Sequence, residues 1–165
     1  MDIVGPLPRT HRGNRYILIV VYHFIKHAEA YALPDQEAIT IVRVFLNEFI
    51  SRLGIPYINY TDRVANIESN MFKELFQLLN IKKTCTSPYY LKCNNQLEII
   101  HCMLIELLAF DVANPTKNWD LNLSIVLIAY RWAVQSSPGL APHFMLFGCE
   151  MRSPLDSMYR LPKRS

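Results

Sequence analysis

The chain has 165 residues and a formal net charge of +3, and 51% of its residues are hydrophobic while 19% are charged. This length is sufficient for one domain with a hydrophobic core, and the composition argues against an intrinsically disordered chain. The sequence pI near 8.7 permits an anionic partner without requiring one. Four cysteines and five histidines show no paired metal-ligand spacing, which argues against a zinc site.

The N-terminal stretch does not read as a secretory signal peptide, because Asp2 and Pro6 interrupt its apolar residues. The longest apolar run extends from Tyr16 to Tyr22, and it is far shorter than the roughly 20 residues that a membrane-spanning helix needs. We therefore expect a nuclear or cytoplasmic protein with reduced thiols, neither secreted nor held in a membrane.

The first third of the chain predicts three strands followed by a long helix. Asp2–Val4 is the candidate first strand, and the continuous apolar run 16–22 is typical of a strand that is buried on both faces. A third strand is expected at residues 28–33. Asp35 is a suitable N-cap for a helix over residues 36–53, where apolar residues recur at helical spacing.

The rest of the chain predicts strands that alternate with helices. A short strand over residues 57–61 ends just before Asp62, and Ser69 is expected to cap a helix that runs to Leu79. The inward face of that helix is predicted to carry Met71, Leu75, Leu78 and Leu79. A fifth strand at 81–84 and helices at 94–112, 119–134 and 142–147 complete the list.

A strand meander followed by alternating helices and strands predicts an α/β layered domain, with a mixed sheet covered by helices on both faces. We expect residues 1–150 to form this domain. Residues 151–165 are basic and contain proline, and we expect them to form a loosely ordered tail.

Three acidic residues occupy positions in the predicted strands and helices that a metal site could use. Asp2 lies in the first strand, Asp62 follows a predicted strand, and Glu98 stands on a predicted helix with 35 residues between it and Asp62. Phosphodiester exchange can use two divalent metals, and Mg²⁺ and Mn²⁺ prefer oxygen ligands such as clustered carboxylates. Spacing alone is weak evidence, because a second acid at a chosen offset arises by chance roughly once in twelve. Three unrelated surface acids would give the same spacing.

The sequence motifs around these acids resemble those of the catalytic core of retrovirus-like integrases, specifically those of gypsy-type LTR retrotransposons. DIVGPLP at Asp2–Pro8 resembles the first catalytic strand, and residues 13–33 resemble the next two strands. GIPYINYTDRVANIES at 54–69 carries the second aspartate, and TSPYYLKCNNQLE at 86–98 carries the glutamate. Further matches are Trp119, Ala129-Tyr130, Ser137-Pro138-Gly139, Pro142 and Phe147-Gly148.

The resemblance implies an RNase H-like fold with a mixed five-stranded sheet. It also implies two reactions, which are trimming of DNA 3′ ends and their joining to target DNA. Asp2, Asp62 and Glu98 map onto the catalytic ligands of Mg²⁺ or Mn²⁺ in such cores. Positions that approach DNA in that family correspond to Tyr89 and Asn94, and Lys92 in the same loop is expected to contact phosphate.

The sequence departs from the family pattern close to the acids. Val64 stands where a glycine is usual, and a β-branched residue cannot adopt positive φ cheaply. Tyr90-Leu91 replaces His-Pro, and Ile99–Cys102 replaces a more polar and basic run. Other departures are Tyr22, His27, Ile67, Asn95 and Arg131. These changes, and a chain that begins one residue before Asp2, indicate a degenerate or truncated copy.

Two functions follow as alternatives. The first is a retrotransposon integrase core that processes and joins DNA, with its catalysis impaired by the altered surroundings of the acids. The second is a catalytically inactive descendant that binds nucleic acid or a protein partner through the same fold. A homodimer is a further possibility, because the helix 119–134 is apolar nearly all round, although burial within one chain would explain that pattern equally well.

Overall fold

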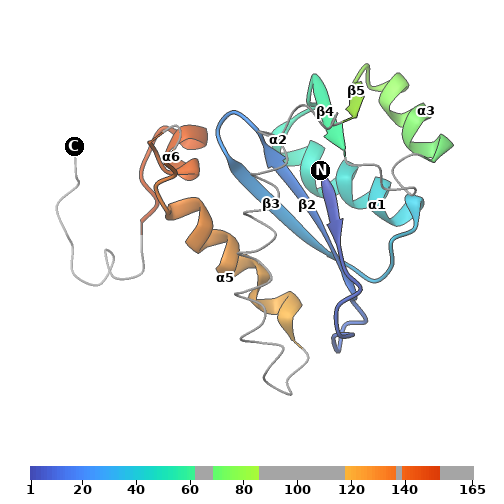
Figure 1. Ribbon diagram of the computed structural model, residues 1–165, viewed down its shortest axis with the longest axis horizontal. Helices are drawn as coiled ribbons and strands as arrows, with labels where there is room; N and C mark the ends of the chain where they lie inside the picture. The colour runs from blue at the N-terminus through green and yellow to red at the C-terminus, as the bar shows by residue number, and fades with distance from the viewer. Residues whose placement is uncertain (62–68, 86–117, 137–138, 153–165) are drawn as a thin grey trace.

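The computed structural model describes residues 1–61, 69–85, 118–136 and 139–152 (Figure 1). The expected helix 94–112 and most of the expected tail, residues 153–165, lie outside these described residues. The elements are β1 (Asp2–Val4), β2 (Tyr16–Tyr22), β3 (His27–Leu33), α1 (Ala38–Val44), η1 (Phe45–Ile50), α2 (Ser51–Leu53), β4 (Ile58–Thr61), α3 (Asn70–Leu78), β5 (Lys82–Cys85), α5 (Trp119–Trp132) and α6 (Pro142–Phe147).

Strands β1, β2 and β3 form an antiparallel sheet with β2 in the centre. Asp2 pairs with Ile19 on β2, and Tyr16 pairs with Leu33 on β3. Side chains on β2 alternate between the two faces, and both faces are covered by apolar residues. The prediction of a central strand buried on both faces is therefore confirmed.

Two hydrophobic cores lie on opposite faces of this sheet. On one face, Ile17 and Ile19 of β2 pack with the buried side of α5. On the other face, Leu18 and Val20 pack with residues of α1, η1 and α3. Figure 1 shows the same layering, with α5 and α6 on one side of the strands and α1 and α3 on the other. The helices thus hold the strands from both sides, as the predicted α/β order requires.

The helix that follows β3 begins later than predicted and changes its pitch. Asp35 is not its N-cap, since α1 begins at Ala38 after Glu37, and Asp35 Oδ1 instead accepts a hydrogen bond from Glu37 N at 2.9 Å. The carboxylate therefore closes a turn ahead of the helix rather than capping it. Residues 45–50 are π-helical, so the expected single α-helix over 36–53 is wrong in this segment.

Helix α3 has the predicted cap but a different buried face. Ser69 Oγ accepts a hydrogen bond from Phe72 N at 3.5 Å, which confirms Ser69 as the N-cap. Phe72 and Phe76 are buried, whereas Met71 is 40% exposed and Leu78 is 83% exposed. The prediction that Met71 and Leu78 face inward is wrong, because the two larger aromatic rings take the inward positions.

Strands β4 and β5 pair in parallel, with Thr61 opposite Cys85. The backbone nitrogen of Met1 donates a hydrogen bond to the carbonyl of Tyr60 at 2.8 Å, so the start of β1 lies against β4. Among the described residues these strands form two sheets, antiparallel β1–β3 and parallel β4–β5, so both pairing directions of the predicted mixed sheet are present.

The C-terminal part of the described chain consists of α5 and α6. The indole nitrogen of Trp119 donates to the carbonyl of Pro8 at 2.7 Å, which ties the start of α5 to the loop after β1. Helix α6 ends before Gly148, which has a φ of 70° as a C-terminal glycine commonly does. None of the helices in the described ranges has the length and apolar character that crossing a bilayer demands.

Candidate active site

Asp2 is the one predicted metal ligand within the described residues. It is half-buried in β1, and its Oδ1 accepts a hydrogen bond from the backbone nitrogen of Ile3 at 2.7 Å. Pairing with Ile19 fixes its place along the sheet. The backbone of its own strand therefore holds one carboxylate oxygen, while the pairing with β2 fixes the backbone position of Asp2.

The turn that follows β1 depends on Gly5. This residue has a φ of 140°, and an added Cβ would lie 2.6 Å from Cδ1 of Tyr16 and 2.8 Å from the carbonyl oxygen of Arg15. Only glycine meets both demands, since any side chain there would press on the start of β2. The GPLP segment stays close to the start of β2, where the backbone nitrogen of Leu7 donates a hydrogen bond to the carbonyl of Arg15 at 2.7 Å.

The strand that precedes Asp62 ends close to Asp2. Met1 is bonded to Tyr60, and Tyr60 is separated from Asp62 by Thr61 alone. Thr61 in turn pairs with Cys85, the last residue of β5, after which the chain continues toward Glu98. The ends of β4 and β5 therefore lie side by side, next to the strand that holds Asp2.

The remaining predicted site residues fall outside the described ranges. They are Asp62, Tyr89, Lys92, Asn94 and Glu98. Within the described ranges, the His, Cys, Asp and Glu side chains form no group of three or more that could hold a metal ion. The structure thus fixes Asp2 and the strand end before Asp62, while the positions of the other ligands stay predictions.

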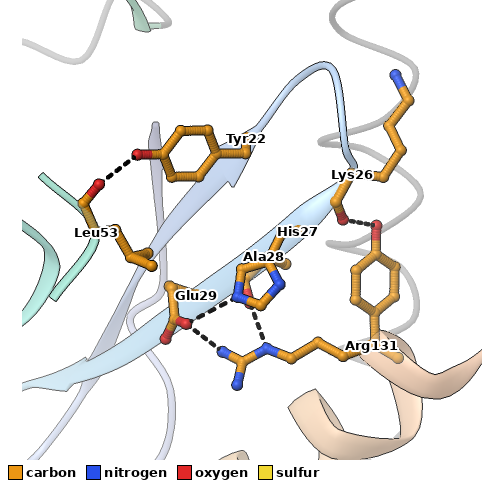
Figure 2. Close-up of polar contacts among 8 residues, drawn as sticks. Tyr22, Lys26, His27, Ala28, Glu29, Leu53 and Arg131 are labelled. Carbon is orange, nitrogen blue, oxygen red and sulfur yellow. Dashed lines mark hydrogen bonds and ion pairs between the residues drawn. The ribbon is translucent and has the colours of Figure 1, made fainter. Parts of the chain in front are cut away.

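A separate polar cluster joins β3 to α5, on the face of the sheet that α5 covers (Figure 2). Nη2 of Arg131 lies 2.7 Å from Oε1 of Glu29, and its Nε donates to the carbonyl of Ala28 at 2.9 Å. Nε2 of His27 is 3.1 Å from the same Glu29 oxygen. The hydroxyl of Tyr130 donates to the carbonyl of Lys26 at 2.9 Å. Tyr130 and Arg131, consecutive residues of α5, are therefore bonded to the residue before β3 and to the first part of β3.

The charges in this cluster are largely removed from water. Side-chain exposure is 18% for Arg131, 12% for Glu29 and 2% for His27. Burial alone would raise the pKa of the Glu29 carboxyl, but the hydrogen bond with His27 and the charge of Arg131 outweigh it, so this pKa lies below its ordinary value. Burial raises the pKa of Tyr130 to about 12. The cluster is a structural ion pair rather than a metal site.

Sequence reasoning did not identify this cluster, although a signal for it was present. His27 and Arg131 both depart from the residues usual in the family that the chain resembles. The structure brings both to Glu29, so two departures that are far apart in sequence share one partner. Tyr22, a third departure, donates from its hydroxyl to the carbonyl of Leu53 at 3.2 Å (Figure 2).

Solved structures with the same fold are integrase cores. The catalytic core domain of BIV integrase matches with a TM-score of 0.67 at 21% identity, covering 87% of this chain and 90% of that one. A chain of the simian T-cell lymphotropic virus intasome, determined in complex with the PP2A regulatory subunit B56 gamma, matches with a TM-score of 0.66 at 18% identity. That match covers 95% of this chain and 54% of the other. The chain therefore has the RNase H-like α/β fold of retroviral integrase cores.

Relatives in sequence are polyproteins of retroviruses and of a transposon. The Pol polyprotein of transposon 412 from Drosophila melanogaster is 21% identical over 148 residues, which is 90% of this chain. Pro-Pol of simian foamy virus type 1 is 26% identical over 158 residues, and Gag-Pol of feline leukemia virus is 29% identical over 140 residues. No family model matches the chain. The chain spans 12%, 13% and 8% of the lengths of these three polyproteins.

The two comparisons agree with each other. Relatives in sequence are retroviral and transposon Pol polyproteins, and neighbours in structure are integrase catalytic cores. The resemblance that the motifs around Asp2, Asp62 and Glu98 indicated is therefore confirmed at the level of an integrase core.

Proposed function

We propose that this chain is the catalytic core of a retrotransposon-type integrase, which trims DNA 3′ ends and joins them to target DNA. The observation that carries the proposal is the hydrogen bond between Met1 and Tyr60. It holds the strand of Asp2 against the strand that ends one residue before Asp62. Asp2 thus lies in a strand beside the one that leads to Asp62, which supports a shared site. Residues 1–150 form the proposed core, with 151–165 as a basic tail.

The donor set fits a hard divalent cation, because Asp2, Asp62 and Glu98 offer carboxylate oxygens and Mg²⁺ and Mn²⁺ prefer such ligands. These three residues would hold the metal ions. When bound, a metal pair lowers the pKa of an attacking water or hydroxyl and stabilises the departing oxygen of the phosphodiester. The chain contributes the position of Asp2, whose backbone is paired with β2 and whose Oδ1 accepts a hydrogen bond from the backbone of Ile3.

DNA is the proposed substrate and partner. Tyr89, Lys92 and Asn94 are the residues that we expect to contact it, with Lys92 at a phosphate and the other two in the same loop. Two lysines of β5, Lys82 and Lys83, precede that loop in the sequence and are further positive charges for a phosphate backbone. A protein with this activity would act in the nucleus or the cytoplasm, where it meets DNA ends.

The test is a strand-cleavage and joining assay with labelled duplex DNA ends and added Mn²⁺. We expect the chain to nick and join these ends at a rate well above that of Asp62→Asn, and a chelator should remove the difference. Equal rates for the two proteins would refute the proposed activity. In that case, DNA binding that weakens steeply with added salt would favour the inactive binding module instead.

The exposed apolar residues of α5 favour a second copy of this chain as a partner. Trp119, Leu123 and Val126 face the core, but four apolar residues on another face are exposed. They recur at helical spacing, and their exposed fractions are 45% for Leu121, 63% for Ile125, 44% for Ile128 and 44% for Trp132. A contiguous apolar stripe of this kind commonly marks an interface. We therefore infer that the chain forms a homodimer through α5.

Placing a charge in the middle of this stripe is expected to separate the dimer. Ile125→Glu should raise the dimer dissociation constant by roughly 30-fold or more. This change corresponds to about 2 kcal/mol of binding free energy, as expected for the loss of one central interface contact. Sedimentation equilibrium over a range of concentrations measures the change. Leu78→Glu is the matched control, because Leu78 is exposed on α3 and away from the stripe. A wild-type chain that stays monomeric at high concentration would exclude the interface.

A further inference from the structure

Two large aromatic side chains are exposed at the end of the molecule where β4 and β5 begin. Tyr57 directly precedes β4 and is 92% exposed, and Phe24, in the turn between β2 and β3, is 81% exposed. In Figure 1, this turn and the start of β4 lie at the same, upper end of the strands. His23, the neighbour of Phe24, lines the same cavity as Tyr57. The two rings therefore belong to one surface.

The residues of this surface carry positive charge and no negative charge. We define the aromatic end as residues 22–26, 54–58 and 81–83. These residues include Lys26, Lys82 and Lys83, and neither Asp nor Glu occurs among them. The backbone nitrogen of Lys82 donates a hydrogen bond to the carbonyl of Tyr57 at 3.0 Å, and the Lys82 side chain is exposed. A cation thus stands beside an exposed ring, which favours an anionic partner that also offers apolar faces.

His23 contributes a third ring to the aromatic end rather than a further charge. Its side chain is exposed at the surface, and it belongs to the same turn as Phe24. Burial of part of the ring and the nearby charge of Lys26 lower the pKa of His23 below its ordinary value of 6.5. The imidazole is therefore neutral at neutral pH, and a neutral flat ring is suited to stacking.

Unpaired nucleotides offer the two kinds of group that this surface lacks. Their bases have flat faces that stack on aromatic side chains, and their phosphates pair with lysines. In a duplex, the bases stack on one another and have no free face for Phe24 or Tyr57. An acidic peptide would match the charge of the lysines without using the two flat rings. Single-stranded nucleic acid therefore matches both the rings and the charge.

The aromatic end is separate from the candidate active site. Tyr57 lies just before the first residue of β4, whereas Asp62 follows its last residue, Thr61. Each residue of a strand advances by about 3.3 Å, so the length of β4 places the two ends of this strand roughly 10 Å apart. Stacking at Tyr57 needs no carboxylate and no metal ion.

We propose that the aromatic end binds single-stranded nucleic acid, with unpaired bases stacked on Phe24 and Tyr57 and a phosphate beside Lys82. This surface is additional to the loop of Tyr89, Lys92 and Asn94 that we expect to contact DNA. The proposal does not depend on the proposed catalysis, because binding here requires neither cleavage nor joining of DNA.

The test is the fluorescence anisotropy of a labelled oligothymidylate of about 12 nucleotides, a length within the usual range for such surfaces, in the presence of a chelator. Phe24→Ala and Tyr57→Ala are each expected to raise the dissociation constant roughly tenfold, as loss of one stacked base predicts. Tyr57→Phe keeps the ring and should bind as wild type does, whereas Tyr57→Leu should bind as weakly as Tyr57→Ala. Leu78→Ala is the matched control, because Leu78 is 83% exposed on α3.

An abasic oligonucleotide of the same length separates stacking from charge. We expect wild type to bind it roughly tenfold or more weakly than the oligothymidylate, and Tyr57→Ala to bind it as wild type does. Lys82→Gln should lower the slope of log affinity against log salt concentration by about 0.7, the value for one phosphate contact with a single strand.

Three results would each overturn the proposal. They are a wild-type chain that does not bind the oligothymidylate, equal binding of the abasic strand, and wild-type affinity in both alanine variants. Asp62→Asn should bind the oligothymidylate as wild type does. Loss of nicking with intact binding would therefore refute only the proposed activity, and nicking with unchanged binding in the alanine variants would refute only this surface.

Discussion

Asparagine in place of Asp2 is expected to reduce Mn²⁺-dependent DNA nicking by roughly 10³-fold, a loss of about 4 kcal/mol of transition-state stabilisation. The reason is that a neutral amide is a poorer metal ligand than a carboxylate and cannot balance the charge of two metal ions. The fold should be unaffected, because the asparagine oxygen can accept the same hydrogen bond from Ile3 that Asp2 accepts. Initial nicking rates and the urea midpoint, measured on the same preparation, separate the two effects.

Glu74→Gln is the matched control for Asp2→Asn. Glu74 is exposed on α3, so its neutralisation changes the net charge equally without touching the candidate site. We expect its nicking rate to stay within about twofold of wild type. If Asp2→Asn retained full activity while Asp62→Asn abolished it, Asp2 would not be a metal ligand and the three-carboxylate arrangement would be refuted.

Methionine in place of Arg131 is expected to destabilise the chain by about 3–5 kcal/mol. Only 12% of the Glu29 side chain is exposed. Removing the guanidinium of Arg131 therefore leaves a buried carboxylate without its cation. His27 alone would remain as a partner at 3.1 Å. Urea unfolding at neutral pH measures the loss, and helix α5 should lose its attachment to β3 at Ala28 as well.

The surface pair of Arg52 and Glu48 supplies the control for this substitution. Arg52→Met removes the same charge from the same kind of pair, but the two side chains are 58% and 43% exposed. It should therefore cost less than about 1 kcal/mol. Glu29→Gln combined with Arg131→Met should recover part of the loss, since the buried charge is then absent. Equal costs for Arg131→Met and Arg52→Met would contradict a buried ion pair.

The pH dependence of the Arg131→Met effect has a defined sign. The folded-state pKa of Glu29 lies below its ordinary value of 4.5. A carboxyl with a depressed pKa contributes stability above its unfolded pKa and loses that contribution as pH falls through the folded value. The stability difference between wild type and Arg131→Met should therefore be fully present at neutral pH and shrink as the solution is acidified below about pH 4.5.

Hydrophobic periodicity predicted the strands well and the helix faces less well. The run YILIVVY predicted a doubly covered strand because no polar residue interrupts it, and β2 has those bounds. The apolar residues of helix α3 form one broad face that includes both Met71 and Phe72, so periodicity alone could not choose between these two. The choice was made by tertiary packing, since the ring of Phe76 meets that of Phe45 from η1 edge to face, with centroids 6.4 Å apart. Local pattern cannot encode such a contact.

Predictions for the candidate site divide in a similar way. The sequence motif around Asp2, which resembles that of the family, indicated the fold and the position of Asp2 in the first strand, and both are confirmed. The bond from Met1 to Tyr60 could not be predicted, because it joins residues 59 positions apart through backbone atoms that every sequence possesses. Likewise, nothing in the local sequence of Glu29 reveals that Arg131 lies beside it.

The π-helical segment η1 gives the connection between β3 and β4 a point at which chain length can vary. Ser51 donates its backbone N–H to the carbonyl of Leu46, five residues back instead of four. Such a segment holds roughly one residue more than an α-helix of the same rotation. Loss of one residue here would restore α-helical bonding without turning Ser51–Leu53 relative to Ala38–Val44, whereas loss within α1 would turn everything after it by about 100°. Loss of one residue from η1 during sequence drift would therefore leave β4 in its register.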